Sequence, residues 1–256
     1  MSKTSSGFSG KFVAKPSSRG VDPRSIRNEI LLSLPAKECA TVLSELEFVE
    51  MHSYDLLNEM GEPIEYCYFM NSGMTSILTI MGDGKGVEVG LTGKEGFIGL
   101  PVVVGLITSA TRAIVQITGS AYRLSTPQIL QVLAKCPRLT RRLNRYSQEL
   151  GMQATQVAAC NRLHEVEQRL ARWLLMSQDR IGADMVPLTQ EFLSHMLGTR
   201  RASVTVAAGV LQKAGLIKYS RGAVTIVDRA KLEDAACECY AIISRQSQSW
   251  RNEAQA

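Results

Sequence analysis

The feature that most constrains the fold is a glycine that separates two short amphipathic segments between Leu188 and Ile217. Thr189 can cap a first helix, Gly198 supplies a tight turn, and Thr199 can cap a second helix. The first helix turns four apolar side chains inward: Phe192, Leu193, Met196 and Leu197. Two short helices that cross at a glycine turn are predicted to form a helix-turn-helix.

The second helix has a packing side and an outward side. Its packing side carries Val204, Ala208 and Leu211. Arg201, Ala202 and Thr205 face away, at the helix N-terminus where backbone N–H groups favour phosphate and recognition helices meet base edges. We expect Arg201 to read a base, because a guanidinium fork can pair with guanine O6 and N7. The side chains predicted to contact phosphates are Thr189, Gln190, Arg200 and Ser203.

Two short strands follow the second helix. The segments Leu216–Tyr219 and Ala223–Val227 alternate in polarity and are joined by a tight turn, Ser220-Arg221-Gly222. Lys218 and Arg221 near the tip are predicted to add phosphate contacts that do not depend on base sequence. The sequence therefore favours a winged helix-turn-helix over an ordinary helical core.

The charge distribution agrees with a polyanion-binding C-terminal half. From Ile30 to Ser125 there are five Lys or Arg against eleven Asp or Glu, whereas Pro137 to Leu232 has fifteen against seven. A basic region of this kind is typical of a nucleic-acid partner, although the arginines could also cover solvated helix faces. The predicted partner is double-stranded DNA.

The remaining sequence features are typical of a globular protein without a membrane segment. No stretch approaches the roughly 18 to 20 apolar residues needed to cross a bilayer, and Met1–Gly20 lacks an apolar signal core, so we expect a cytoplasmic protein. The opening residues are rich in Ser, Gly and Lys, which predicts a flexible tail over residues 1–24.

A β-domain is predicted after this tail, over residues 25–126. Short apolar runs alternate with clusters of glycine and other turn-forming residues, as in an antiparallel barrel or sandwich. The candidate strands are Glu65–Met70, Met74–Met81, Val87–Leu91, Ala110–Ile117 and Ala121–Leu124. A short helix, Pro35–Leu46, is expected before them.

A long helix is predicted over residues 127–161. Apolar residues recur there at alternating spacings of four and three: Leu139, Leu143, Tyr146, Leu150, Val157 and Cys160, with Gln153 interrupting the row. We interpret the row as a dimerisation seam, and packing within its own chain is the alternative. A further helix, Leu163–Ser177, and a polar connector, Asp179–Asp184, lead to the helix-turn-helix.

The cysteines do not show the paired spacing of a metal site. The six are Cys39, Cys67, Cys136, Cys160, Cys237 and Cys239. Cys237 and Cys239 are the closest pair, but two positions apart on a helix they would point about 200° away from each other, which disfavours a shared metal. The three histidines are dispersed. We therefore predict reduced thiols, with no metal site and no cofactor.

No catalytic constellation stands out from the sequence. There is no evident nucleophile with a base or pair of acids, and the glycines of Gly90–Gly99 lack the Lys-Ser/Thr ending of a phosphate-binding loop. The protein is predicted not to be an enzyme.

The sequence resembles the Crp/Fnr family, the regulators similar to the bacterial cyclic AMP receptor protein. The resemblance rests on Leu188–Ile217 and above all on the tract Gly209–Ile217, which looks like the family's passage into the wing. It implies a homodimer on a palindromic operator, with RNA polymerase as a further partner. The family's second helix commonly carries Arg-Glu and a later Arg, whereas this chain has Arg201, Ala202 and Val206, so a different operator is expected.

The β-domain departs further from the members that bind cyclic nucleotides. Their phosphate cassette resembles Gly-Glu-Leu followed by Arg-Ser or Arg-Thr, and this chain has Gly99-Leu100-Pro101 and Thr111-Arg112-Ala113. Arg112 is the one candidate effector-binding residue, because it could meet an anion, and the effector is unknown. The iron-sulfur and haem patterns of other family sensors are not found in the sequence.

The predicted fold class is α+β. An N-terminal sensor domain similar to a double-stranded β-helix or jelly roll (25–126) precedes the dimerisation helix (127–161), the winged helix-turn-helix domain (162–235) and a C-terminal extension (236–256). The predicted function is sequence-specific DNA-binding transcription regulation of the Crp/Fnr type. The alternative is a cyclic-nucleotide-responsive module that acts through protein partners.

Overall fold

The computed structural model describes residues 23–220 and 222–255, which form two compact units. The N-terminal unit comprises residues 23–84 and 92–148, and the C-terminal unit comprises residues 85–91 and the chain from Glu149 onward. Most of the predicted tail (1–22) and the wing residue Arg221 lie outside the described residues. The prediction of an α+β chain with a β-sheet domain before a helix-turn-helix domain is confirmed.

Two long antiparallel strands, β3 (Tyr66–Ile80) and β6 (Arg112–Ser125), form the centre of the sheet in the N-terminal unit. β1 (Glu47–Met51) and β2 (Leu56–Asn58) pair with β6, and β5 (Phe97–Ile98) pairs with β3. The sequence predicted neither β1 nor β2 nor β5, because short strands with few β-branched residues give a weak periodic signal.

The breaks predicted inside β3 and β6 are wrong. The turn expected at Asn71–Gly73 and the gap after Ile117 are register shifts inside two continuous strands. Gly73 and Gly119 lie opposite each other there, and a Cβ on Gly119 would be 2.2 Å from the Ser72 carbonyl oxygen. Glycine therefore permits the close approach of two backbones at a bulge, where the sequence pattern predicts a turn.

Helices cover this sheet and complete its core. They are the turn η1 (Pro23–Ser25), α1 (Glu29–Leu32), α2 (Ala36–Leu43), α3 (Leu100–Val103), α4 (Thr126–Lys135) and the first part of α5 (Pro137–Leu163). Tyr122, Phe69 and Phe97 are fully buried at the centre of the core, together with Leu139 and Leu143 of α5. The predicted helix Pro35–Leu46 corresponds to α2, with Pro35 at the N-cap.

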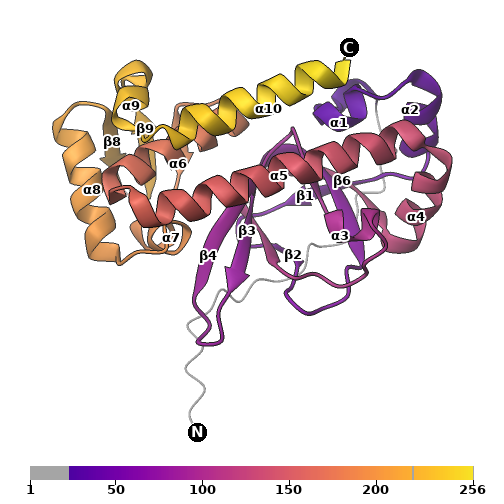
Figure 1. The fold of residues 1–256 in the computed structure, drawn as a ribbon, viewed down its shortest axis with the longest axis horizontal. Helices are drawn as coiled ribbons and strands as arrows, with labels where there is room; N and C mark the ends of the chain where they lie inside the picture. The colour runs from indigo at the N-terminus through magenta and orange to yellow at the C-terminus, as the bar shows by residue number, and fades with distance from the viewer. Residues whose placement is uncertain (1–22, 221, 256) are drawn as a thin grey trace, which may run out of the picture. The chain divides into compact units, whose positions relative to one another are not determined.

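The C-terminal unit is mainly helical (Figure 1). It contains the end of α5, α6 (Val166–Ile181), α7 (Gln190–Met196), α8 (Arg201–Lys213), α9 (Arg229–Ala235) and α10 (Cys239–Gln255), with a small sheet of β7 (Met185–Pro187), β9 (Ala223–Ile226) and β8 (Ile217–Ser220). Most of strand β4 (Gly86–Thr92) also belongs to it. The buried Glu88 of β4 accepts a hydrogen bond from the indole Nε1 of Trp173, at 2.9 Å.

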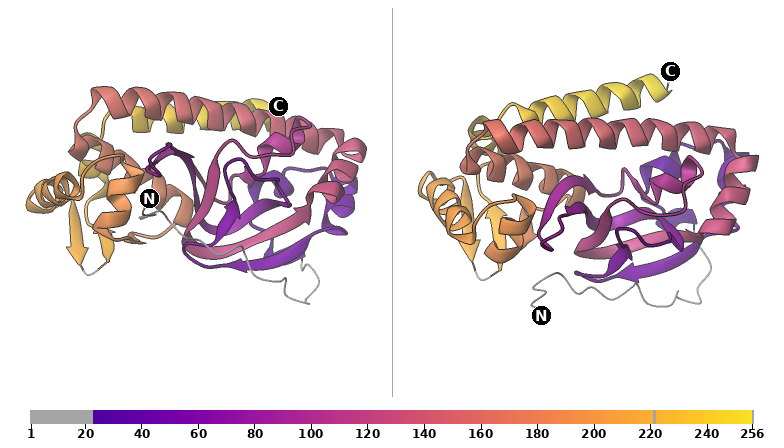
Figure 2. Two further views of the ribbon diagram at one scale, coloured as in Figure 1. Left: turned by 90° about the horizontal axis from the view of Figure 1, so that it is seen from below. Right: turned by 60° about the horizontal axis from the view of Figure 1, so that its bottom comes forward.

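Helix α10 runs antiparallel to the last part of α5, and the two lie side by side in Figures 1 and 2. Gln156 contacts Cys239 at the start of α10, and Glu149 pairs with Arg251 near its end. Cys237 precedes α10 and Cys239 is its first residue, so the assumption that both cysteines share one helix is wrong.

Most residues of the predicted dimerisation seam are buried within the chain itself. Leu139, Leu143 and Tyr146 are buried in the N-terminal unit, and Gln153 and Val157 are buried in the C-terminal unit. Packing within its own chain, the alternative interpretation, therefore accounts for these five residues, and the dimerisation role of the helix stays a prediction. None of the helices in the described part of the chain could span a membrane.

A substitution at Gly119 tests the contact between the two long strands. Gly119→Ala should lower the free energy of unfolding by about 1 to 3 kcal/mol, because the added methyl group has only backbone atoms to displace. Gly82→Ala is the matched control, since a Cβ there meets no atom within 4 Å. Urea unfolding of the full chain measures both, and equal stabilities of the two variants would contradict the prediction.

Candidate DNA-binding site

The first helix of the motif, α7, begins as the sequence predicts. The Thr189 side chain accepts a hydrogen bond from the backbone N–H of Phe192, at 3.2 Å. The inward residues Phe192 and Leu193 are buried. This cap satisfies one of the N–H groups that a helix leaves without a partner at its start, and it fixes the position where α7 begins.

The turn that follows α7 depends on Gly198, which has a left-handed backbone with φ +57°. Its N–H donates to the His195 carbonyl, and a Cβ at this position would lie 3.3 Å from the Val87 side chain. The turn predicted from this glycine is confirmed. The predicted Thr199 cap is wrong: the N-cap of α8 is Arg200, and its side chain makes no capping hydrogen bond.

A buried arginine stabilises this turn from behind. Arg169 of α6 is 7% exposed, and its Nη2 donates a hydrogen bond to the Leu197 carbonyl at the end of α7. No sequence pattern indicated this contact. From the sequence, Arg169 is only one of the basic residues of the C-terminal half. The guanidinium of Arg169 therefore binds the protein backbone, and Arg169 is not a candidate for contact with phosphate.

Helix α8 separates its packing side from its outward side as predicted. Val204, Ala208 and Leu211 are buried against the rest of the unit, and so is Ala207. No acidic residue lies in the first turn of α8. The N-terminus of this helix therefore keeps the positive end of its dipole available to an anion.

The predicted DNA-contacting residues gather at the start of α8 and beside it. Arg200, Arg201 and Thr205 are exposed, Thr189 is exposed at the start of α7, and Ser203 and Gln190 are half-buried. The Thr205 hydroxyl lies 2.9 Å from Gln190 Oε1, so the two short helices are linked across their outward faces. This arrangement can place a guanidinium and several hydroxyl groups against one groove of a duplex.

Two exposed or half-exposed side chains extend this surface beyond the predicted set. Val206, which is 64% exposed, presents an apolar side chain on the outward face of α8. Tyr219 lies on β8, and its hydroxyl donates to the Leu188 carbonyl at 3.2 Å. Burial raises the pKa of Tyr219, while the nearby positive charge of Arg201 opposes the rise. The phenol therefore stays a protonated donor beside Arg201.

The wing is the antiparallel pair β8 and β9, as predicted, with β7 added on the other side of β9. Lys218 is exposed on β8. The backbone N–H of Tyr219 donates to Gln212 at the end of α8, at 2.8 Å, which attaches the wing to the second helix. Lys218 can therefore contact the same polyanion as the start of α8.

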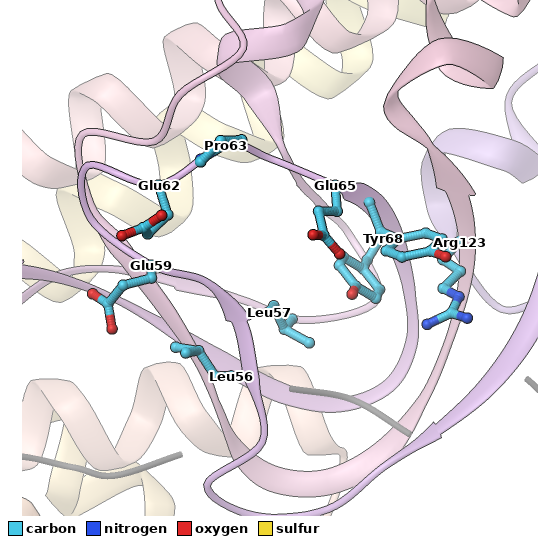
Figure 3. Close-up of a pocket in the computed structure, with 9 residues that line it drawn as sticks. Leu56, Leu57, Glu59, Glu62, Pro63, Glu65, Tyr68 and Arg123 are labelled. Atoms are coloured by element: carbon cyan, nitrogen blue, oxygen red, sulfur yellow. The ribbon is translucent and has the colours of Figure 1, made fainter. Parts of the chain in front are cut away.

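The N-terminal unit contains a cavity of about 420 Å³ beside strand β2. Figure 3 shows the carboxylates of Glu59, Glu62 and Glu65 around it. Arg123 also lines the cavity, but it pairs with Glu47 at 3.1 Å and stacks on the Tyr66 ring. Acidic side chains of this kind disfavour a phosphate ligand.

The candidate effector residue Arg112 is already paired. Its Nε lies 3.0 Å from both carboxylate oxygens of Glu59, and its Nη2 lies 2.7 Å from one of them. This bidentate ion pair engages the Nε and Nη2 edge of the guanidinium and offsets its positive charge. The geometry therefore favours a structural role for Arg112, and its effector role stays a prediction.

Comparison with known families identifies the C-terminal domain. Residues 168–235 match the model of the Crp-like helix-turn-helix domain. The match begins within α6 and ends at the last residue of α9, so it contains all the candidate DNA-contacting residues described above. Among curated proteins, no sequence is similar enough to this chain to count as a match.

Solved structures show the same fold over most of the chain. FixK2 from Bradyrhizobium japonicum has a TM-score of 0.65 and 16% identity, and the alignment covers 75% of this chain and 98% of FixK2. CLP, a c-di-GMP-responsive global regulator from Xanthomonas campestris, has a TM-score of 0.63 and 17% identity, with 75% and 99% covered. A CRP/FNR-family regulator from Thermus thermophilus has a TM-score of 0.53 and 20% identity, with 74% and 98% covered.

A helix-turn-helix with an exposed basic second helix and an attached wing defines a DNA-binding protein. The chain carries a Crp-like helix-turn-helix domain and has the fold of Crp/Fnr regulators, which supports DNA-binding transcription regulation. The prediction made from the sequence is confirmed at this level.

A substitution at Gly198 tests the turn on which α8 depends. Gly198→Ala should lower the free energy of unfolding of the C-terminal unit by about 1 to 2 kcal/mol, because residues other than glycine are strained at positive φ. Gly209→Ala, within α8 and with no atom near its Cβ, should instead raise it by about 0.5 to 1 kcal/mol. Urea unfolding separates the two, and a stabilising Gly198→Ala would contradict the role of the turn.

Proposed function

We propose that α8 enters the major groove of its operator and that Arg201 reads a base edge there. The supporting observation is the division of α8, in which a buried side fixes the helix while Arg201 and Thr205 are exposed next to its N-terminus. A guanidinium at that end can donate two hydrogen bonds to guanine, and the helix dipole favours the adjacent phosphate.

The other predicted residues are assigned roles according to their positions on the surface. Phosphate contacts are assigned to Thr189, Gln190, Arg200, Ser203 and Lys218, and Arg221 of the wing turn, outside the described residues, is assigned the same role. Thr205 borders the base-reading position because it lies one turn beyond Arg201. The exposed Val206 can pack on a thymine methyl group, which agrees with an operator different from that of the cyclic AMP receptor protein.

The proposed working form is a homodimer on a palindromic operator, with RNA polymerase as a further partner. Both parts rest on the resemblance to the Crp/Fnr regulators. Leu139, Leu143 and Val157 are buried within the chain, so less buried residues beside them would supply the dimer contact. Binding to chromosomal DNA implies a cytoplasmic location. No enzymatic activity is proposed, and the effector is left open.

Replacing Arg201 and Lys218 separately tests the two kinds of contact. Arg201→Ala should weaken operator binding by about 1 to 3 kcal/mol and leave binding to unrelated duplexes nearly unchanged. Lys218→Ala should weaken binding to every duplex alike and reduce the slope of log affinity against log salt by about one. Fluorescence anisotropy on the operator and on a scrambled duplex, at several salt concentrations, measures both effects.

The operator for this test is first obtained by selecting bound fragments from random duplexes. Lys213→Ala is the control, because Lys213 lies at the opposite end of α8 from the proposed contact. An Arg201→Ala variant that keeps wild-type affinity for the operator would refute the assignment of Arg201. A wild-type protein that binds no duplex even at low salt would refute DNA binding by α8.

Light scattering on the free protein and on its complex tests the dimer. We expect twice the chain mass in solution and two chains on one operator, because each recognition helix reads one half-site. One chain per operator would overturn the homodimer while leaving the base-reading role of Arg201 intact.

A further inference from the structure

Four potential metal ligands meet in the C-terminal unit, away from the DNA-binding surface. They are Cys160, His164, Cys237 and Cys239. The three cysteines are buried, and the His164 side chain is 17% exposed. One Sγ or ring nitrogen from each residue lies within 4.8 Å of the other three.

Local structure brings these side chains together from two distant segments. Cys160 and His164 are one helical turn apart at the end of α5, where the His164 N–H donates to the Cys160 carbonyl, so both face the same way. Cys237 lies in the turn before α10, and the Tyr240 N–H donates to its carbonyl. Because only Cys239 is helical, the two cysteines can converge, which the sequence-based geometry excluded.

Two of the separations between the ligand atoms match those around one tetrahedral ion, and all four atoms lie within 4.8 Å of one another. The Sγ atoms of Cys160 and Cys237 are 3.4 Å apart, and Sγ of Cys239 is 3.5 Å from Nδ1 of His164. Metal–ligand bonds of about 2.0 to 2.3 Å place tetrahedral ligands about 3.5 to 3.8 Å from one another. An iron-sulfur cluster inserts further iron and sulfide atoms between its ligands, so it needs a wider site than this one.

Glu238 completes the arrangement on the outer side of the histidine. Its Oε2 lies 3.2 Å from Nε2 of His164, while Nδ1 of the same ring faces Cys239. Metal-binding histidines commonly donate their second ring N–H to a carboxylate, which fixes the tautomer and the ring orientation. The ring is therefore set to offer Nδ1 as a ligand.

Positively charged side chains lie close to the cluster. Arg169 and Arg172 of α6 are buried, and within the described part of the chain their Nε atoms have no hydrogen-bond partner. Arg172 lies close enough to Cys160 for its positive charge to act on that side chain. Three thiolates, a neutral histidine and a divalent ion carry one net negative charge, which the guanidinium groups can balance.

We propose that Cys160, His164, Cys237 and Cys239 bind one Zn²⁺ ion in a closed tetrahedral site. Three sulfur ligands and one nitrogen ligand are a set that zinc takes in structural sites, and four protein ligands leave no position open for a substrate. The ion fastens the junction of α5 and α6 to the start of α10 (Figure 1). None of these four residues is among those to which contacts with DNA are assigned.

Metal analysis of the full chain tests the proposal. The protein is purified without a histidine tag or chelator, under reducing conditions, and metals are measured by mass spectrometry. We expect one zinc per chain for the wild type and for Cys39→Ser, whose cysteine lies outside the cluster, and a loss of zinc in Cys237→Ser. Replacement of zinc by Co²⁺ should give thiolate-to-cobalt charge-transfer bands and the strong visible absorption of a tetrahedral ion.

A milder variant covers the case in which Cys237→Ser does not fold. Glu238→Gln keeps all four ligands but removes the carboxylate that positions His164, so it should bind zinc about 10- to 100-fold more weakly than the wild type. Competition with a chromogenic chelator measures that difference, and removal of zinc should lower the melting temperature of the wild type. Circular dichroism verifies that the variant is folded.

Three results would overturn the proposal. The first is a metal-free, folded protein whose six cysteines all titrate as thiols. The second is a disulfide between Cys160 and Cys237, seen as two fewer thiols after denaturation without reductant. The third is iron together with acid-labile sulfide in place of zinc.

Discussion

The left-handed backbone at Gly198 is the constraint on which the presentation of α8 depends. It allows α7 to end and α8 to begin within a few residues, and a Cβ at Gly198 would make a tight contact with the Val87 side chain. The Thr189 cap before it and the Arg169 hydrogen bond behind it hold the same turn. The exposed guanidinium groups of α8 can bind a duplex only because this buried scaffold fixes the direction of the helix.

The sequence predicted the DNA-binding domain well because its signals are local. A capping threonine, a glycine turn and a helical apolar period act within a few residues, and the structure places each of them as expected except the Thr199 cap. Non-local contacts were harder to predict. The bulges at Gly73 and Gly119 depend on the pairing of two strands that lie far apart in the chain, and no pattern within either strand reveals this.

Two predictions made for the helices depended on contacts that the sequence does not show. The row from Leu139 to Cys160 has the period of a coiled-coil seam, but period alone does not distinguish a second copy of a helix from the chain's own sheet and helices. Cys237 and Cys239 were judged as if on one helix, although α10 begins between them. In both cases the partner of a side chain is set by tertiary contacts that sequence spacing cannot supply.

The burial of Arg169 affects how mutagenesis of this protein should be interpreted. An alanine scan of the basic residues would show impaired DNA binding for Arg169, as it would for a residue that touches the duplex. Arg169 is 7% exposed and donates to a backbone carbonyl, so its loss would act by loosening the scaffold. Reduced affinity that comes with reduced thermal stability would therefore distinguish such an indirect defect from the removal of a true contact.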